Sequence, residues 1–215
     1  SILRRLQERD GSCDMVKTDF LVIGSGIAGL SFALEAARSG SVLVLTKRTA
    51  SDSSSYLAQG GIAAALGGED SLDKHIEDTL RTGAGLCHEE VVRLIVRRGP
   101  EIIRKMSGAG VKFTRQSNGE LHLGREGGHS ERRIAHVEDF TGMHLIAFLL
   151  EQVRAAPAIT LREGFTAVDL ILPSKFGAAE HRCVGCYALD NRTGEVETLI
   201  SSCTVIAAGG AGKVY

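Results

Sequence analysis

Six consecutive residues have the types and spacing of a loop that binds phosphate. They read Gly24-Ser25-Gly26-Ile27-Ala28-Gly29 and directly follow an apolar run, Phe20 to Ile23. In this G-x-G-x-x-G pattern the first glycine makes a tight turn, the second lets backbone approach a pyrophosphate, and the third lets a helix pack closely on a strand. A helix that begins within the pattern directs free N–H groups and a positive dipole end at the phosphates. The pattern therefore predicts a dinucleotide-binding loop.

A second group of residues could contact a substrate. Residues 121–136 contain three histidines, several arginines and two carboxylates without amphipathic periodicity, and their middle reads Arg125-Glu126-Gly127-Gly128-His129-Ser130. Polar side chains on a glycine-rich loop are typical of substrate or cofactor sites. A metal site formed by His122, His129 and His136 is the alternative, but no two of them have a metal-ligand spacing on a helix. We therefore expect no metal ion.

The five cysteines are scattered, and two of them form a C-x-x-C pattern, Cys183 to Cys186. Their odd number and the absence of a secretory signal favour reduced thiols in a cytoplasmic protein. A zinc site would need a second ligand pair nearby, and a redox pair usually opens a helix. Residues 182–189 have instead the composition of a strand, in which positions three apart point to opposite faces. We interpret the pattern as a coincidence within a strand.

The elements that position these residues alternate between strands and helices. A strand over Phe20–Ile23, a helix over Leu30–Ser39 and a strand over Val42–Leu45 place the glycine loop at the end of a buried parallel strand. Further helices are predicted from the Ser71 N-cap to about Thr82, from about His88 to a break at Gly99-Pro100, from Pro100 to about Gly108, and from the Thr141 N-cap to Ala155. Strands are predicted over residues 159–161, 167–172, 182–189, 196–200 and 204–210. This order indicates a Rossmann-like α/β fold with a parallel sheet, flanking helices and an antiparallel β-meander.

Three loops beside these elements could contact the same dinucleotide. Lys47 stands where many NAD-binding domains have an acidic residue that binds the ribose, which argues against an ordinary NAD-binding domain. Residues 49–55 are rich in serine and lead to Gly60-Gly61, so they form either a flexible linker or a loop that wraps a ligand. The last predicted strand ends in Gly209-Gly210, a second place where backbone can approach a nucleotide.

Composition limits the kind of partner. The 215 residues are 43% hydrophobic and carry a formal net charge of −1, which gives no electrostatic reason to expect nucleic acid or an anionic membrane. The apolar runs are far shorter than a membrane span, and the N-terminus lacks the pattern of a signal peptide. The length suits one sizeable domain. We expect a polar tail over residues 1–17 and a domain over residues 18–215.

Together these motifs resemble the flavoprotein family of L-aspartate oxidase, succinate dehydrogenase and fumarate reductase, over about residues 18–215. The most specific segments are Ala58-Gln59-Gly60-Gly61-Ile62-Ala63 and Arg125 to Ser130. Succinate dehydrogenases and fumarate reductases carry a histidine, covalently joined to the flavin, five residues before that glutamine. This chain has Ser54 there, so it is most similar to the aspartate oxidase branch, in which FAD is noncovalent.

The resemblance implies where FAD and substrate would bind. Glu126 would face the ammonium group of the substrate, and His129 and Ser130 would help to shape that pocket. FAD would be held by the glycine loop, by the segment around Lys47 and the serine-rich loop, and by the end of the last strand. The cofactor-binding residues expected in this way are Gly24, Ser25, Gly26, Ile27, Ala28, Gly29, Lys47, Ser54, Ser55, Tyr56, Leu57, Ala58, Gln59, Gly60, Gly61, Ala208 and Gly209.

The resemblance also implies a reaction. L-aspartate would be oxidised to iminoaspartate, with a hydride passing to the flavin and then to oxygen or fumarate. This step opens the bacterial route to quinolinate and NAD, which makes the next enzyme, quinolinate synthase, a candidate partner. Two alternatives stay open: a nucleotide-binding module without turnover, and a dicarboxylate dehydrogenase flavoprotein subunit, which Ser54 disfavours.

Family members are longer than this sequence. They continue into a capping domain, which supplies arginines for the substrate carboxylates, and into a C-terminal helical domain. We therefore expect residues 18–215 to be the N-terminal part of an FAD-binding domain, truncated before those domains and inactive by itself.

Overall fold

The computed structural model describes residues 15–179 and 181–210, which divide into two compact units. The first unit contains the described residues up to Tyr56 and from Leu149 onward, and the second unit is Leu57–Phe148. Of the predicted N-terminal tail, residues 1–14 lie outside the described residues, whereas Val16 and Lys17 already belong to a strand. The predicted limits of one domain over residues 18–215 stay a prediction.

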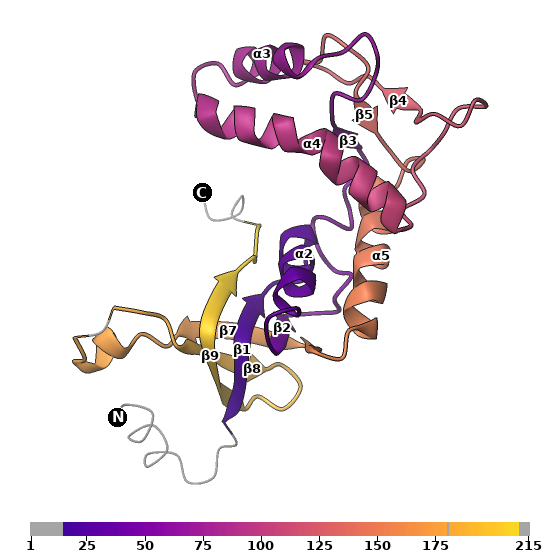
Figure 1. Ribbon diagram of the computed structural model, residues 1–215. Coiled ribbons are helices and arrows are strands. Elements are labelled where there is room, and N and C mark those ends of the chain that lie inside the picture. Colours follow the sequence, from indigo (N-terminus) through magenta and orange to yellow (C-terminus); the bar gives the residue numbers. More distant parts are fainter. Residues whose placement is uncertain (1–14, 180, 211–215) are drawn as a thin grey trace. The chain divides into compact units, whose positions relative to one another are not determined.

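Six strands of the first unit form one sheet in the order β6-β2-β1-β9-β8-β7 (Figure 1). Strands β6, β2, β1 and β9 are parallel, and β9, β8 and β7 are antiparallel. Their bounds are β1 Val16–Ile23, β2 Val42–Thr46, β6 Ile159–Glu163, β7 Phe165–Leu170, β8 Gly185–Asp190 and β9 Val196–Ile206. The predicted α/β class, with a parallel sheet and an antiparallel meander, is confirmed.

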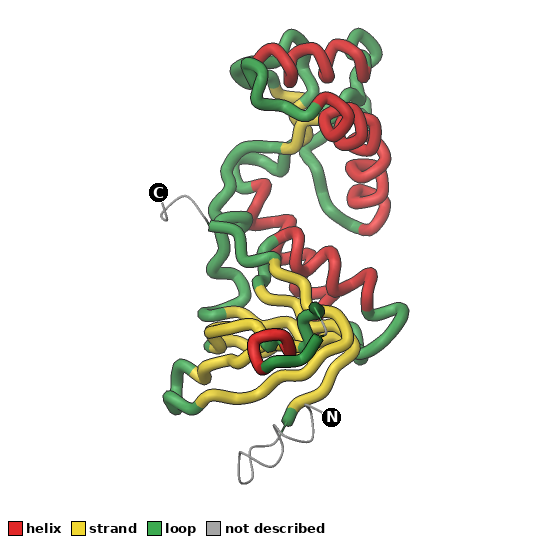
Figure 2. Tube along the Cα trace, turned by 90° about the vertical axis from the view of Figure 1, so that its left-hand side faces the viewer, coloured by secondary structure: helices red, strands yellow, loops and turns green. Residues whose placement is uncertain are grey.

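Alternate residues of the parallel strands are buried on opposite faces of the sheet. Val44 packs with Ala33 of helix α2, which spans Ile27–Ala36. Leu45 belongs to a second cluster, with Phe165 and Cys186 of the meander. All residues of β2 are buried for this reason, as expected of a strand that is covered on both faces. Figure 2 shows the strands of this unit lying side by side.

Strand β9 is continuous, whereas the sequence predicts two strands, over residues 196–200 and 204–210. Leu199 lies opposite Cys186 of the antiparallel neighbour β8, and Val205 lies opposite Val22 of the parallel neighbour β1. The polar residues that suggested a break are accommodated within the strand. Ser201 is buried, and its hydroxyl forms a 2.8 Å hydrogen bond with that of Thr204. One strand therefore joins the parallel sheet to the meander.

The C-x-x-C cysteines lie at and just before the start of β8, which spans Gly185–Asp190, so the predicted strand includes Cys186 but not Cys183. Cys186 is fully buried in the core of the first unit, and burial raises the pKa of its thiol to about 11. Cys183 lies just before the strand, with Sγ 3.2 Å from the carbonyl oxygen of Gly185. A buried thiol with a raised pKa is unreactive. The described cysteines Cys87, Cys183, Cys186 and Cys203 are free thiols, and Cys13 lies outside the described residues.

The second unit combines helices with a small antiparallel sheet, in the order β3-β5-β4. Its elements are β3 Ile62–Ala63, α3 Leu72–Thr82, α4 Glu89–Ala109, β4 Leu123–Gly124, β5 Ile134–Ala135 and the first part of α5 Thr141–Ala155. Helices α3 and α5 lie where the sequence predicts them. The sequence does not predict the small sheet, because strands of two residues are too short to show an alternating pattern.

Helix α4 continues through Pro100, so the predicted break between two helices is wrong. Proline in a helix interior removes one hydrogen bond and costs about 3 kcal/mol or more. Here Val92, Val96, Pro100 and Ile103 form one buried stripe along the helix, and Val92 and Val96 pack against Ile76 of α3. The continuous buried stripe offsets the cost of the proline. The helix ends, as predicted, at a glycine: Gly110 has φ of +119°.

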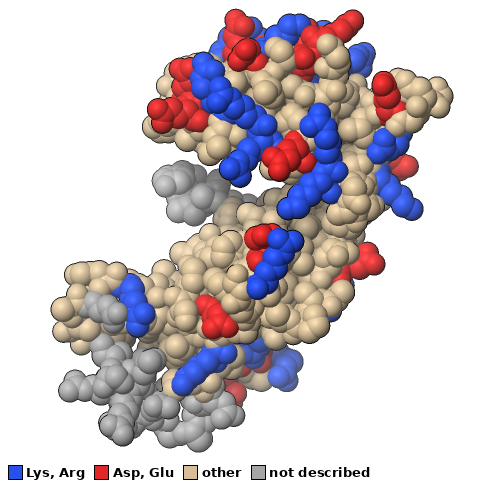
Figure 3. All heavy atoms as spheres, viewed as in Figure 1, with Lys and Arg blue, Asp and Glu red and all other residues tan. Residues whose placement is uncertain are grey.

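Helix α3 begins at the predicted cap but buries a different face. The hydroxyl of Ser71 accepts a 3.1 Å hydrogen bond from the N–H of Lys74. The apolar residues Leu72, Ile76 and Leu80 would share one face of this helix, yet Leu72 is 37% exposed, and the buried residues are His75, Ile76 and Asp78. Two polar side chains are thus turned inward, toward the partners described below. Over α3 and α4, Figure 3 shows basic and acidic side chains interspersed at the surface.

Within residues 15–179 and 181–210, none of the helices combines the length and the apolar character that crossing a bilayer requires.

Candidate functional site

The glycine loop lies at the carboxyl ends of the parallel strands and is shaped by close backbone contacts. The N–H of Gly24 donates to Leu45 in β2, at 2.8 Å, and Gly24 has φ of +115°. A Cβ atom on Gly24 would lie 2.4 Å from the carbonyl oxygen of Ala207, and one on Gly29 would lie 2.1 Å from that of Gly24. Any side chain at these two positions would therefore displace the backbone of the loop or of the segment after β9.

The start of α2 provides unpaired backbone donors. Gly26 is the N-cap residue and gives no side-chain cap, and the N–H of Ile27 donates to Ser55 Oγ at 3.2 Å. Among the described residues, no hydrogen bond engages the amides of Ala28 and Gly29. Free N–H groups at a helix N-terminus, next to a loop with no room for side chains, suit the pyrophosphate of a dinucleotide. The residues present therefore fit FAD.

The side chain of Ser25 holds the glycine loop by hydrogen bonds within the protein. Its buried hydroxyl lies 3.1 Å from Thr46 Oγ1 and donates to the carbonyl oxygen of Ala50 at 2.9 Å. The N–H of Ala50 in turn donates to the carboxylate of Glu163 at 2.6 Å. These bonds tie the glycine loop to the end of β2, and Glu163 takes part although the sequence does not single it out.

Other predicted cofactor residues of the first unit lie at the same edge of the sheet. Strands β2, β1 and β9 end side by side, so Lys47, the glycine loop and the segment from Ala208 to Gly209 follow neighbouring strands. The N–H of Ala207 donates to Ile23 at 2.8 Å, and the side chain of Lys47 is exposed. Ligands of open α/β sheets bind at this edge. Ser54 is exposed, whereas Ser55 and Tyr56 are half-buried.

The predicted residues Leu57 to Gly61 begin the second unit, where Gly61 is packed tightly and the others are exposed. The carbonyl oxygen of Ala58 accepts a 2.9 Å hydrogen bond from Gly142. A Cβ atom on Gly61 would lie 2.4 Å from the carbonyl oxygen of Ala135 in β5. These contacts hold residues 58 and 61 within the second unit, and the binding of a ligand by residues 49–61 stays a prediction.

The predicted substrate residues lie on a turn between β4 and β5. The N–H of His129 donates to the carbonyl oxygen of Glu126 at 3.3 Å, and Arg125 Nε donates to that of His129 at 3.1 Å. Gly128 has φ of +84°, which favours glycine. The carboxylate of Glu126 is exposed and has no hydrogen bond or ion pair with any described residue. It is thus free to bind a cation.

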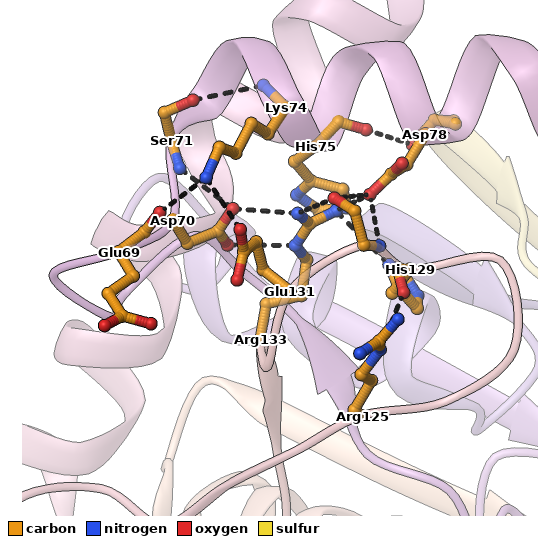
Figure 4. Close-up of polar contacts among 12 residues, drawn as sticks. Glu69, Asp70, Ser71, Lys74, His75, Asp78, Arg125, His129, Glu131 and Arg133 are labelled. Carbon is orange, nitrogen blue, oxygen red and sulfur yellow. Dashed lines mark hydrogen bonds and ion pairs between the residues drawn. The ribbon is translucent and has the colours of Figure 1, made fainter.

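A buried ion cluster, formed by Arg133, Asp70 and Asp78, anchors this turn (Figure 4). Arg133 Nε and Nη2 donate to the two carboxylate oxygens of Asp70 at 2.9 and 2.8 Å, and Nη1 donates to Asp78 at 2.8 Å. Asp78 Oδ2 also accepts the N–H and the hydroxyl of Ser130, each at 2.7 Å. The three charged side chains are at most 3% exposed. Arg133 compensates the charge of both carboxylates in part, and Asp78 forms a second ion pair with Arg81, whose side chain reaches the surface.

The cluster changes the titration of two side chains. Burial raises the pKa of the Asp78 carboxyl, but the hydrogen bonds from Ser130, Arg133 and Arg81 outweigh it and hold the pKa well below the ordinary value. Burial and the nearby positive charge of Arg133 lower the pKa of His75. Asp78 is therefore ionised and His75 neutral at physiological pH.

The three histidines of the segment 121–136 do not form one group. His122 Nδ1 lies 2.9 Å from His136 Nε2, whereas the ring of His129 packs edge-on against that of His75, with centroids 5.7 Å apart. The structure thus does not bring His122, His129 and His136 together. Among the described residues there is no group of three or more metal-ligating side chains.

The sequence does not single out Arg133, Asp70, Asp78 or His75 as site residues. The available signal was weak: two polar residues three apart, His75 and Asp78, interrupt the apolar positions of α3, and Arg133 directly precedes the apolar pair Ile134-Ala135. Nothing in one sequence shows that these segments meet.

Comparison with curated proteins finds relatives named L-aspartate oxidase. L-aspartate oxidase 1 of Ralstonia nicotianae is 50% identical over 199 residues, which cover 92% of this chain and 37% of that protein. L-aspartate oxidase of Pseudomonas aeruginosa is 46% identical over 204 residues, covering 92% of this chain and 38% of that protein. The chain thus spans less than two fifths of the length of these relatives.

Solved structures share the fold. A variant of FrdA of E. coli quinol fumarate reductase matches with a TM-score of 0.85 and 26% identity, over 94% of this chain and 34% of that one. The Sdh1 complex of Mycobacterium smegmatis matches with a TM-score of 0.85 and 27% identity, over 94% of this chain and 36% of that one. The family model described as FAD binding domain matches residues 19–215. The chain therefore belongs to the FAD binding domain family, and its cofactor is FAD.

Proposed function

We propose that the protein containing this chain oxidises L-aspartate to iminoaspartate and holds FAD noncovalently. The names of its curated relatives support the reaction, and the free carboxylate of Glu126 is the structural observation that carries it. A substrate ammonium group needs an anionic partner, and Glu126 is an exposed carboxylate on an anchored turn. His129 and Ser130 lie beside it and shape the same part of the site.

In this proposal, the glycine loop binds the pyrophosphate through the amides at the start of α2. Lys47, Ser54, Ser55, Tyr56, the segment Leu57–Gly61 and the pair Ala208-Gly209 complete the contacts to FAD. Bound FAD supplies the two-electron oxidation chemistry, and the protein supplies binding, orientation and electrostatics. Glu126 holds the ammonium group by a charge-assisted hydrogen bond, which fixes the amino acid in one orientation.

The proposal also includes the electron acceptor, the biosynthetic pathway and the cellular location of the protein. Oxygen or fumarate takes the electrons, and the product leads to quinolinate and NAD through quinolinate synthase. The location is the cytoplasm, which agrees with the four described cysteines being free thiols. We expect residues 1–215 alone to show no measurable turnover, because the family resemblance implies that the arginines for the substrate carboxylates come from a further domain.

The test uses the full-length protein. Acid precipitation should release all flavin into the supernatant, and peroxide should form with L-aspartate in air but not with D-aspartate or succinate. Fumarate should replace oxygen under anaerobic conditions. Flavin that stays with the pellet would contradict noncovalent binding. Oxidation of succinate in place of aspartate would favour a dicarboxylate dehydrogenase. FAD binding without turnover of any tested substrate would favour a nucleotide-binding module without activity.

A further inference from the structure

The side chain of Arg133 is fully buried, and each of its three nitrogen atoms donates a hydrogen bond to a carboxylate of the second unit. The planar guanidinium donates in a fixed fork, so two bonds to Asp70 and one to Asp78 determine its orientation. Asp70 has no hydrogen bond to the turn that carries Glu126; its other bond is to the N–H of Ser71. The orientation of Arg133 is therefore set from outside that turn.

One contact of Arg133 concerns the protonation of His129. Nη1 of Arg133 lies 3.4 Å from Nδ1 of His129. A guanidinium can donate hydrogen bonds but cannot accept them, so Nδ1 must be the acceptor and carries no proton. The neutral imidazole then has its proton on Nε2. The edge-on ring of His75 packs against the His129 ring and restricts its rotation.

A second contact passes through Asp78. Its Oδ2 accepts from Arg133 and from both the N–H and the hydroxyl of Ser130. The hydroxyl proton of Ser130 is thus directed at Asp78, and the backbone of the turn is fixed at this residue. Arg133 also donates its own N–H to Gly124, at the other end of the turn, at 3.1 Å. The turn is held at both ends around one arginine.

We propose that Arg133 is a positioning residue, which holds the turn from Glu126 to Ser130 and selects the tautomer of His129 that carries its proton on Nε2. The proposal rests on the proposed function, in which this turn faces the substrate. An Nε2–H is a donor, so His129 is suited to a carboxylate oxygen of an amino-dicarboxylate and not to the role of a base.

The test compares Arg133→Lys with a matched control, Arg162→Lys, in the full-length protein loaded with FAD. Arg162 also makes a two-bond ion pair, with Glu197 at 2.6 and 2.7 Å, but lies in the first unit and contacts none of the predicted site residues. The first readout is the ring-nitrogen NMR spectrum of ¹⁵N-histidine protein, in which the signal of His129 is identified by its loss in His129→Gln. The second readout is kcat/KM for L-aspartate.

In the wild type and in Arg162→Lys, we expect the spectrum of His129 to show a single tautomer, with the proton on Nε2. In Arg133→Lys we expect a mixture of both tautomers of His129. We expect kcat/KM to fall at least tenfold in Arg133→Lys, with FAD content unchanged, and to stay within about twofold in Arg162→Lys. If Arg133→Lys does not fold, Asp70→Asn replaces it, because that change disturbs Arg133 without touching the turn.

An unchanged tautomer in the folded variant would overturn the proposal, and so would a changed tautomer with unchanged kcat/KM. If the wild type does not oxidise aspartate at all, the proposed function is wrong, and the NMR comparison still decides whether Arg133 controls the protonation of His129.

Discussion

The carboxylate of Glu126 lies directly beside Gly60: a Cβ atom built on Gly60 would be 3.4 Å from Oε1 and 3.9 Å from Oε2. Gly60 belongs to the segment predicted to contact FAD, and Glu126 to the turn predicted to contact substrate. A larger side chain at position 60 would compete with a ligand for the space around the carboxylate. The two predicted functions therefore meet within one unit of the fold.

Replacing Glu126 by glutamine should keep FAD and weaken the use of aspartate. The change removes one charge from an exposed side chain without described partners, so the fold is unaffected. A hydrogen bond to a charged group contributes about 1.5–3 kcal/mol, so kcat/KM should fall roughly tenfold or more. Glu101→Gln, on the exposed surface of α4, is the control. Unchanged kinetics in Glu126→Gln would refute its role.

Gly26→Val should abolish FAD binding. A Cβ atom at this position already lies 3.3 Å from Ser55 Oγ, and the further methyl groups would fill the space before the free amides of α2. The measurement is the flavin-to-protein ratio after purification with excess FAD. Gly68→Ala is the control, because a Cβ there meets nothing within 4 Å. A normal flavin content in Gly26→Val would show that phosphate binds elsewhere.

Arg133→Met should destabilise the protein far more than Arg162→Met. Removing Arg133 takes away three hydrogen bonds to buried carboxylates and leaves Asp70 without its ion-pair partner, whereas Asp78 keeps Arg81. Loss of one partner of a buried pair costs about 3–5 kcal/mol. The side chains of Arg162 and Glu197 are about a quarter exposed, so water can replace the lost bonds and the cost should be about 1 kcal/mol. Urea unfolding measures the loss in free energy of unfolding for each of the two variants. Equal losses would mean that the buried cluster is not a major source of stability.

Stability should decrease as the pH falls below about 6.5, and part of this decrease should vanish in His75→Phe. The pKa of His75 is lower in the folded protein than the value of about 6.5 in an unfolded chain. The unfolded state therefore binds more protons below that pH, so acid favours unfolding. The free energy of unfolding is measured from pH 7.5 to 5.0 for both proteins. Parallel curves would contradict a neutral, buried His75.

The sequence predicts the order of the first two strands and of helix α2 correctly because their signals are local, although α2 begins at Ile27, three residues before the predicted start, and ends at Ala36, three residues before the predicted end. Strand composition, glycine spacing and helix caps all lie within a few residues of one another. The ion cluster could not be predicted in this way, since Arg133 is 63 residues from Asp70 and 55 from Asp78. The error at Pro100 has the same origin: α4 is buried along one side, and two residues of that buried stripe, Val92 and Val96, pack against Ile76 of α3, which the sequence of one helix does not reveal.

The position of β9 has a consequence for biosynthesis. Val16 of β1 pairs with Leu199, so 183 residues must be translated before this neighbour exists. At roughly 5–20 residues per second, the delay is about 10–40 s. During that time one edge of β1 has unpaired N–H and C=O groups, a state that favours association with other chains. Pairings between such distant segments also fold slowly. The nascent chain should therefore depend on chaperones until β9 has left the ribosome.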